Sequence, residues 1–364
     1  MLDYSNPELL VNTNTDPKEG TIRWRSPSNL ALIKYWGKFG RQYPRNPSIS
    51  FTLDHAFTDT QLQYLPKVDA DTEIELEFFF EGQKNDAFRE KLLRFLENIV
   101  PILPFLKQFR LRIHSSNSFP HSAGIASSAS SMSALALCLC TMEKQLFGTL
   151  EEDADFRQKA SYLARLGSGS ACRSVYPTMA IWGENEIVEA GSNDYAIPYD
   201  QAIHEVFKNY HDDILIASRG EKSVSSRAGH ALMEGNIYAD NRYAQARQRF
   251  ADLLKALQSG DLERFGQITE NEALTLHALM MTSEPSYLLM RPNTLEMIER
   301  VRAYRAETKH ALYFSLDAGP NLHLLYPDAI KMEVKNFIKN ELVPFCENGE
   351  WIEDQVGAGP KLVF

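Results

Sequence analysis

The feature that most constrains this chain is a run of small residues, Ser118–Ser131, between a predicted strand and a predicted helix. Small side chains let a backbone pass close to a ligand, and Gly124 can adopt conformations that other residues resist. The start of a helix carries about half a positive charge, so an anion binds well there. Neither GxxxxGK[ST] nor GxGxxG occurs. The run predicts a phosphate-binding loop of another type or, alternatively, a helix start packed against a neighbour.

Length, charge and cysteine content narrow the class of protein. The 364 residues are 44% hydrophobic and 24% charged, which is typical of a globular protein with two domains or one large bilobal domain. The net charge of −10 argues against nucleic-acid binding. The four cysteines form no CxxC pair, so we expect free thiols in a reducing compartment. No apolar run spans a membrane and residues 1–20 lack a signal sequence, so a cytoplasmic enzyme is expected.

Short strands are predicted mainly in the first half of the chain and long helices mainly in the second. The predicted strands are Ile22–Arg25, Ser48–Leu53, Thr60–Tyr64, Glu73–Phe80, Phe109–Ser115, Asp213–Ala217, Ala311–Leu316 and Leu322–Tyr326. The predicted helices are Asp86–Ile99, Ser127–Phe147, Glu151–Leu166, Arg242–Gln258, Leu262–Met281, Pro292–Ala306 and Asp328–Leu342. Thr178–Trp182 and Glu186–Glu189 are predicted to form a hairpin around residues 183–185.

This order of elements predicts an α+β fold with two lobes. We expect a lead-in over residues 1–20, a first lobe over residues 21–200 that carries the small-residue loop, and a second lobe over residues 201–364. The boundary is expected near Pro198–Ala202.

Two lysines and two aromatic residues fall within the five residues Lys34-Tyr35-Trp36-Gly37-Lys38. Lysines donate hydrogen bonds to anionic oxygens, and a neighbouring aromatic ring excludes water and strengthens that interaction. The segment therefore indicates an anion site, with an ordinary surface strand that ends at a glycine as the alternative.

A second candidate anion site is the turn Gly167-Ser168-Gly169-Ser170, which interrupts a predicted helix. Its hydroxyls and successive amides can surround an anion, and Arg173 can bind a carboxylate or phosphate through two parallel hydrogen bonds. A flexible linker is the alternative, although linkers seldom carry such an arginine. Cys172 is expected to be a packed small residue.

Asp317 ends an apolar strand and precedes a Gly-Pro turn. A carboxylate in this position either forms the turn or accepts a proton from a reacting group. The sequence pattern alone leaves both possibilities open.

Together these motifs resemble the GHMP kinase superfamily and, within it, the diphosphomevalonate decarboxylase family. The small-residue loop is similar to the superfamily's Pro-x-x-x-Gly-[Leu/Ile]-x-Ser-Ser-Ala phosphate loop, with Ser131 where glycine is common. Residues 29–38, 167–174 and 317–321 resemble the family's Asn-Ile-Ala-x-x-Lys-Tyr-Trp-Gly-Lys, Gly-Ser-Gly-Ala/Ser-Cys-Arg-Ser and Asp-Ala-Gly-Pro-Asn. The resemblance spans about residues 21–361.

The resemblance implies the two-lobed GHMP kinase fold, with an N-lobe like domain 2 of ribosomal protein S5, a ferredoxin-like C-lobe and an active-site cleft between them. It implies that the catalytic residues are Asp317, which would face a tertiary hydroxyl, Lys34 and Arg173. The implied ATP-binding residues are Gly124, Ile125, Ala126, Ser127, Ser128 and Ala129. The implied substrate-binding residues are Tyr35, Lys38, Ser168, Ser170, Arg173 and Ser226.

The reaction implied by the resemblance is the ATP-dependent decarboxylation of (R)-5-diphosphomevalonate to isopentenyl diphosphate, with ADP, phosphate and CO2 as the other products. ATP and Mg²⁺ are the implied cofactors, and the sequence does not identify the metal ligands. The implied partners are the two small molecules and a second copy of the chain in a homodimer, with no nucleic acid and no membrane.

Two other functions stay open at this point. A kinase of the same superfamily would phosphorylate mevalonate or phosphomevalonate without decarboxylation, which the Lys34–Lys38 segment and Arg173 disfavour. A non-catalytic nucleotide-binding regulator is disfavoured by Asp317. Lys84 and Arg89 are candidates for a basic helix residue that contacts nucleotide or substrate in the family, and His277 is assigned no role.

Overall fold

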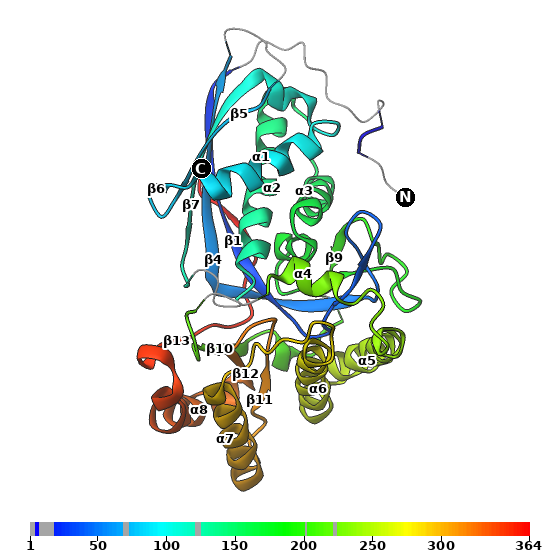
Figure 1. Ribbon diagram of the computed structural model, residues 1–364, viewed down its shortest axis with the longest axis vertical. Helices are drawn as coiled ribbons and strands as arrows, with labels where there is room; N and C mark the ends of the chain where they lie inside the picture. Colours follow the sequence, from blue (N-terminus) through cyan, green and yellow to red (C-terminus); the bar gives the residue numbers. More distant parts are fainter. Residues whose placement is uncertain (1–3, 7–17, 68–72, 121–124, 201, 221–223) are drawn as a thin grey trace.

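The computed structural model describes residues 4–6, 18–67, 73–120, 125–200, 202–220 and 224–364. Two lobes are stacked along the long axis of the molecule (Figure 1). The strands are β1 (Gly20–Ala31), β2 (Lys38–Phe39), β3 (Tyr43–Pro44), β4 (Ser48–Pro66), β5 (Glu75–Phe80), β6 (Gln83–Lys84), β7 (Phe109–Asn117), β8 (Met179–Trp182), β9 (Ala196–Pro198), β10 (Tyr210–Leu215), β11 (Tyr313–Ser315), β12 (Leu322–Pro327), β13 (Trp351–Ile352) and β14 (Lys361–Leu362). The α-helices are α1 (Asp86–Ile99), α2 (Ser127–Phe147), α3 (Asp153–Gly167), α4 (Ser226–Ala231), α5 (Ala239–Ser259), α6 (Leu262–Met281), α7 (Pro292–Thr308) and α8 (Lys331–Phe337).

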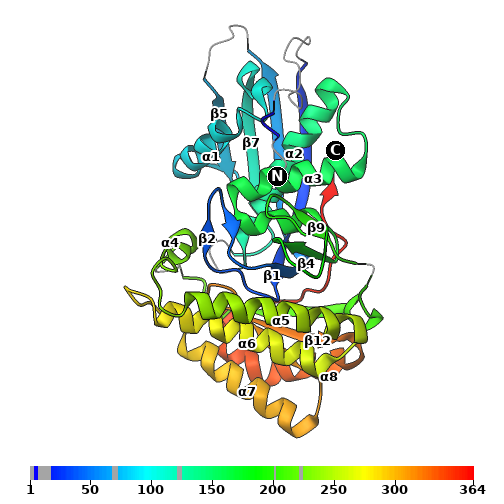
Figure 2. The same cartoon turned by 90° about the vertical axis from the view of Figure 1, so that its right-hand side faces the viewer.

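The first lobe is built on a mixed sheet whose strand order is β14-β1-β4-β7-β5-β6, with β8 paired onto the first part of β4 and β9 paired onto β8. Helices α1, α2 and α3 lie on one face of this sheet (Figure 2). Their apolar side chains, such as Leu96, Leu137 and Leu163, form a single buried core with Leu62 and Leu111 of the strands. Burial of this core fixes the position of the start of α2 relative to the sheet.

The second lobe contains a four-stranded antiparallel sheet of order β11-β12-β10-β13. Helices α5 and α6 lie below the end of the first sheet and pack against the second sheet (Figure 2). One buried core joins Leu30 and Phe51 of the first lobe to Phe250 and Phe265 of these helices and to Leu325 of the second sheet. The two lobes are therefore held together by apolar packing.

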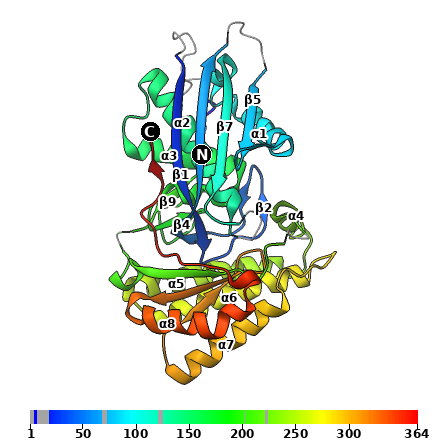
Figure 3. The same cartoon turned by 90° about the vertical axis from the view of Figure 1, so that its left-hand side faces the viewer.

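The C-terminal segment returns to the first sheet (Figure 3). Strand β14 pairs antiparallel with β1, with Trp24 opposite Leu362. Val356 forms an isolated bridge with Leu53 on the way. No helix within the described ranges is long and apolar enough to cross a membrane.

The α+β two-lobed fold expected from the sequence is confirmed, and helices α1, α2 and α6 have the predicted bounds. The predicted strands Ser48–Leu53 and Thr60–Tyr64 are parts of one long strand, β4, whose pairing with β1 changes register near Pro27. The carboxylate of Asp354 accepts hydrogen bonds from backbone amides at the middle of β4. This bonding satisfies amides where the strand passes from one part of the sheet to the other.

The prediction of a strand over Glu186–Glu189 is wrong. The side-chain oxygen of Asn185 accepts hydrogen bonds from the amides of Ile187 and Val188, so the backbone turns at this point. Such local side-chain bonds compete with a sheet ladder. Strand β8 pairs instead with β9, which lies further along the chain.

The prediction of one helix over Asp328–Leu342 is also wrong in detail. The segment consists of a 3₁₀ turn over Asp328–Ile330, then α8, and then a π-helical turn over Ile338–Leu342. The apolar spacing runs through all three parts. Since this spacing does not distinguish α-, 3₁₀- and π-helical turns, the sequence predicted a single helix.

Candidate active site

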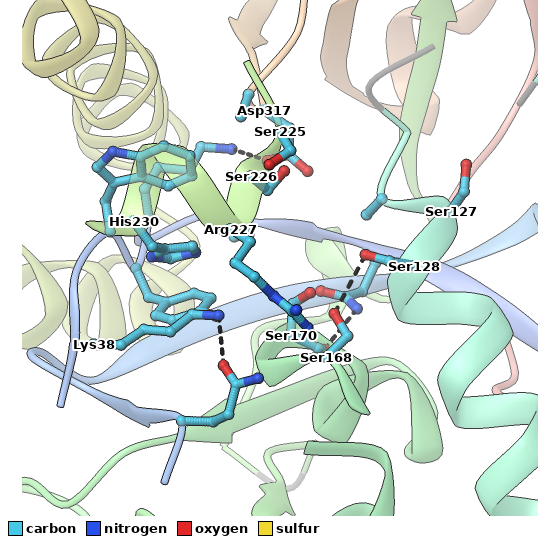
Figure 4. Close-up of a pocket in the computed structure, with 18 of the residues that line it drawn as sticks. Lys38, Ser127, Ser128, Ser168, Ser170, Ser225, Ser226, Arg227, His230 and Asp317 are labelled. Carbon is cyan, nitrogen blue, oxygen red and sulfur yellow. Dashed lines mark hydrogen bonds and ion pairs between the residues drawn. The ribbon is translucent and has the colours of Figure 1, made fainter. Parts of the chain in front are cut away.

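A cavity of about 610 Å³ lies where the two lobes meet. It is lined by the loop after β1, the first turns of α1, the start of α2, the 3₁₀ helix Gly169–Val175, α4 and the turn after β11. The predicted site residues that line it are Lys34, Tyr35, Lys38, Ala126, Ser127, Ser128, Ser168, Ser170, Arg173, Ser226 and Asp317. Several of them are labelled in Figure 4. Segments far apart in the sequence therefore meet at one place.

An ion pair between Lys34 and Asp317 joins the two lobes inside this cavity. The Lys34 Nζ atom donates to Asp317 Oδ1 at 2.8 Å. The lysine side chain is 2% exposed and the aspartate side chain 20% exposed, so the carboxylate alone meets the solvent of the cavity. Lys34 follows the end of β1 and Asp317 follows the end of β11, which explains how the strands place the pair.

The guanidinium group of Arg173 is buried beside this pair. It donates to Ser48 Oγ at 2.7 Å, Ser50 Oγ at 3.0 Å and Asn29 Oδ1 at 3.3 Å. Burial lowers the pKa of Arg173, and the Asp317 carboxylate works in the opposite direction. An arginine keeps its charge under such conditions, so a buried cation held by neutral oxygens faces the cavity.

Lys38 provides a second cation. Burial and the nearby Arg227 lower the pKa of Lys38 to about 8. Its Nζ atom donates to Gln42 Oε1 at 2.6 Å and lies 5.9 Å from the ring centroid of Tyr35. Burial raises the pKa of Tyr35, so this phenol stays neutral. An anion placed here would offset the repulsion between Lys38 and Arg227.

The helix start predicted as a phosphate loop faces the same cavity. Ala126 lies in the left-handed region, with φ 45° and ψ 39°, and α2 begins at the next residue. The hydroxyl groups of Ser128 and Ser168 are 3.3 Å apart, so the first turn of α2 meets the residue that precedes the 3₁₀ helix at the cavity wall (Figure 4). Ile125 and Ala129 are buried in the cores and do not line the cavity. Gly124 lies outside the described residues.

Close packing shapes the wall formed by the Gly-Ser turn. A Cβ atom on Gly169 would lie 2.3 Å from the hydroxyl of Tyr35 and 2.8 Å from the Trp182 ring. Only glycine allows this approach. Cys172 is buried next to it, and burial raises the pKa of its thiol to about 12, in agreement with the expected inert packing role.

Three residues of α4 and its cap complete the cavity. Ser225 caps the helix by accepting a hydrogen bond from the amide of Ala228, and Ser225, Ser226 and Arg227 line the wall. Arg227 was not predicted, although it directly follows Ser226, which the resemblance implied as a substrate-binding residue.

The sequence also missed His230. Its ring lies 4.5 Å from that of Tyr35 and 4.4 Å from that of Trp36, and its Nδ1 atom accepts a hydrogen bond from the amide of Gly37. Burial lowers the pKa of His230 well below its usual value. The neutral ring thus packs against Tyr35 and Trp36 and holds the Gly37 amide in place.

The two basic candidates on or near α1 do not line the cavity. Lys84 is exposed in β6, and Arg89 donates to the carbonyl oxygen of Leu76. Phe88 and Lys91 line the cavity instead, with the Lys91 ammonium 5.2 Å from the Phe88 ring centroid. Helical spacing of three residues from Phe88 could have identified Lys91.

Both halves of the chain match known family models. Residues 26–196 match the diphosphomevalonate decarboxylase-like N-terminal domain, and residues 213–360 match the mevalonate 5-diphosphate decarboxylase C-terminal domain. The diphosphomevalonate decarboxylase of Aspergillus fumigatus is 30% identical over 343 residues, which cover 88% of this chain and 80% of that protein.

Solved structures agree. The mevalonate diphosphate decarboxylase of Staphylococcus aureus superposes with a TM-score of 0.80 at 26% identity and covers 95% of this chain and 99% of its own. A structure described as MDDEF in complex with MVAPP, AMPPCP and magnesium has a TM-score of 0.79 at 27% identity and covers 95% and 99% of the two chains. The chain therefore belongs to the diphosphomevalonate decarboxylase family and is an enzyme of ATP-dependent decarboxylation in the mevalonate pathway.

Proposed function

We propose that the cavity holds (R)-5-diphosphomevalonate and Mg-ATP side by side, with the tertiary hydroxyl of the substrate next to Asp317. The observation that carries this proposal is the Lys34–Asp317 pair at the junction of the lobes, with anion-binding groups on either side. A single partly exposed carboxylate beside buried cations suits a hydroxyl that must be aligned and relieved of its proton.

The substrate diphosphate fits the side of the cavity that contains Lys38, Arg227, Ser168 and Tyr35. Two cations and several hydroxyl groups match the charge and the acceptor oxygens of a diphosphate. The substrate carboxylate fits Arg173, whose three bonds to neutral oxygens use three of its five N–H donors.

ATP fits the start of α2. Ser127 and Ser128 supply hydroxyl groups. The backbone amides of the first turn of α2 lie at the end of the helix that lines the cavity, where an anion can accept hydrogen bonds from them. Mg²⁺ prefers oxygen ligands and is usually bound through phosphates, water and one or two carboxylates. The Ser127 hydroxyl lines the cavity at this helix start, so it would hold the ion together with phosphate oxygens and water, and the ion would neutralise charge on the transferred phosphate. The described residues contain no cluster of three or more metal-ligating side chains.

The reaction then follows from this placement. The substrate hydroxyl attacks the γ-phosphorus of ATP and ADP leaves, while Asp317 accepts or orients the hydroxyl proton. The C–O bond of the new phosphate ester then breaks, and inorganic phosphate leaves the tertiary carbon with the electron pair of that bond. The adjacent carboxylate loses CO2, and the electrons of that bond form the double bond of isopentenyl diphosphate. Lys34, Lys38 and Arg173 stabilise the anions, so the protein contributes positioning and electrostatics.

The ratio of products tests the function of the whole chain. Incubation with ATP and diphosphomevalonate is expected to release ADP and CO2 in about equal amounts, since one phosphoryl transfer precedes each decarboxylation. ADP without CO2 would indicate a small-molecule kinase, and binding of ATP without either product would indicate a regulator.

The Arg173→Gln variant tests the carboxylate assignment. Removing the cation should raise the KM for diphosphomevalonate by about tenfold or more and leave the KM for ATP within about twofold. Steady-state kinetics with each substrate varied in turn measures both values. A loss confined to ATP would show that Arg173 does not bind the substrate carboxylate.

We also place the enzyme in the cytoplasm, since the four cysteines are buried free thiols, as is common in a reducing compartment. A homodimer and the division of the chain near residue 200 stay predictions, which sedimentation and limited proteolysis would test.

A further inference from the structure

Two buried side chains of α6 contact the main chain of the two residues that form the central ion pair. Glu272 Oε2 accepts a hydrogen bond from the amide of Lys34 at 2.9 Å. His277 Nε2 lies 3.0 Å from the carbonyl oxygen of Asp317, and it must be the donor because a carbonyl can only accept. Glu272 and His277 are at most 1% exposed, and neither lines the cavity.

Lys34 depends on side chains for its backbone bonds because it lies beyond the end of β1. Its amide is bound by Glu272, and its carbonyl oxygen accepts from Arg242 at 3.0 Å. Arg242 in turn binds both carboxylate oxygens of Glu272. Helices α5 and α6 of the second lobe thus fix both polar groups of a first-lobe residue.

We propose that α6 sets the position of Lys34 relative to Asp317, with Glu272 and His277 as positioning residues for the reaction. This inference rests on the proposed role of the Lys34–Asp317 pair. One helix contacts the main chain of one partner from each lobe, so it fixes the backbone positions from which Nζ and Oδ1 reach their 2.8 Å contact. Misplacing reacting groups by a small distance lowers the rate without weakening binding.

The charge of Glu272 is secured by its surroundings. Burial would raise the pKa of this carboxyl group, but the guanidinium groups of Arg242 and Arg249 hold the pKa below its ordinary value. Glu272 is therefore ionised when it accepts from Lys34, and such charge-assisted bonds are strong and short. Removal of this charge will also affect stability, so a matched control is needed.

Glu270 provides that control on the same helix. It pairs with Arg305 through both carboxylate oxygens, at 2.6 and 3.1 Å, and accepts from the amide of Phe314 at 3.3 Å. It is buried like Glu272, but its bonds go to Arg305 of α7 and to Phe314 of β11 and not to Lys34. The Glu270→Gln variant thus breaks the same type of contact without touching the ion pair.

The experiment compares purified Glu272→Gln, Glu270→Gln, His277→Leu and His277→Gln with the parent enzyme. Glu272→Gln and His277→Leu are expected to lower kcat by about tenfold or more and to keep both KM values within about twofold. His277→Gln, which keeps an N–H donor, should restore kcat to within about threefold of the parent. Glu270→Gln should lower the melting temperature but keep kcat within about twofold.

Equal kcat values for Glu272→Gln and Glu270→Gln, or equal kcat values for the two His277 variants, would overturn the inference. If Glu272→Gln does not fold, the His277 pair decides, because it leaves the Glu272 network intact. Failure of the proposed function would appear differently, as turnover that survives Asp317→Ala in the parent background.

Discussion

Single residues show how this cavity is prepared for polyanions before any ligand arrives. Burial of Lys38 and the positive charge of the nearby Arg227 together lower the pKa of Lys38 to about 8. Below that pH the ammonium is charged, and within the described residues its hydrogen bond goes to the neutral amide oxygen of Gln42. A diphosphate would supply the missing negative charge, so binding and protonation of Lys38 should favour each other.

This linkage predicts a pH dependence of substrate affinity. Above pH 8 the free enzyme loses the Lys38 proton, so the KM for diphosphomevalonate should rise by up to about tenfold per pH unit, while it stays flat between pH 6 and 8. Kinetics from pH 6 to 10 measures this rise. The Lys38→Arg variant keeps its charge throughout. A rise of the same size in that variant would contradict the assignment.

His230 predicts a pH dependence of stability. Burial lowers its pKa well below the usual 6.5, so below pH 6.5 the unfolded chain takes up a proton that the folded chain does not. The free energy of unfolding should therefore decrease with falling pH, by at most about 1.4 kcal/mol per pH unit from this group. His230→Asn retains an acceptor for the Gly37 amide but cannot titrate. Urea unfolding from pH 5 to 7 should show a smaller pH dependence in this variant, and an unchanged one would refute the explanation.

The sequence could predict a site residue only where that residue belongs to a short motif of neighbouring residues. Lys34, Arg173 and Asp317 each belong to such a motif, and the structure places them in one cavity. Glu272 and His230 could not be identified in this way. The Lys34 amide bonds to a residue 238 positions away, and the Gly37 amide to one 193 positions away. Only the folded chain brings these pairs together.

At the scale of elements, the conformation of the residues before α2 determines how the start of this helix is placed at the cavity. Ala126 adopts a left-handed conformation that costs a non-glycine residue about 1 kcal/mol, and its carbonyl oxygen accepts from the amide of Ala129 at 2.7 Å. Ser28 Oγ donates to the carbonyl of Ile125 at 2.7 Å and anchors the loop to β1. The strained turn therefore directs the first amides of the helix into the cavity.

Substitutions at Ala126 test this geometry. Ala126→Val places a β-branched side chain at positive φ, so it should destabilise the protein by about 1–3 kcal/mol and raise the KM for ATP more than that for diphosphomevalonate. Ala126→Gly tolerates the conformation and should leave both KM values within about twofold. Thermal melts and steady-state kinetics check both expectations. Equal effects on the two substrates would contradict a nucleotide role for this turn.

Prediction of the elements succeeded where periodicity is strong and failed where local side-chain bonds decide. Helices α1, α2 and α6 repeat apolar residues at helical spacing over several turns, and their bounds are those predicted. Glu186–Glu189 contains the β-branched residues Ile187 and Val188, which favour a strand, but the Asn185 side chain binds the amides that a ladder would need. The length of β4 was hidden by polar residues in its middle, whose amides Asp354 satisfies from the far end of the chain.

At the scale of the whole molecule, the two lobes share one buried core, and the active-site cavity lies beside it. Each lobe contributes one partner of the central ion pair, Lys34 from the first and Asp317 from the second. The cavity therefore functions only when the lobes keep their relative position. Under the proposed function this pair spans a packed interface, so the relative position of the lobes becomes part of the catalytic machinery.

The most direct test of this account measures turnover and nucleotide binding in the same Asp317→Ala preparation. Loss of the carboxylate should lower the release of CO2 by about 1000-fold, which is within the usual range for removal of a proton acceptor. The affinity for a non-hydrolysable ATP analogue, measured by calorimetry, should stay within about threefold of the parent value. Substantial CO2 release from this variant, or loss of nucleotide binding as the main effect, would contradict the role given to Asp317.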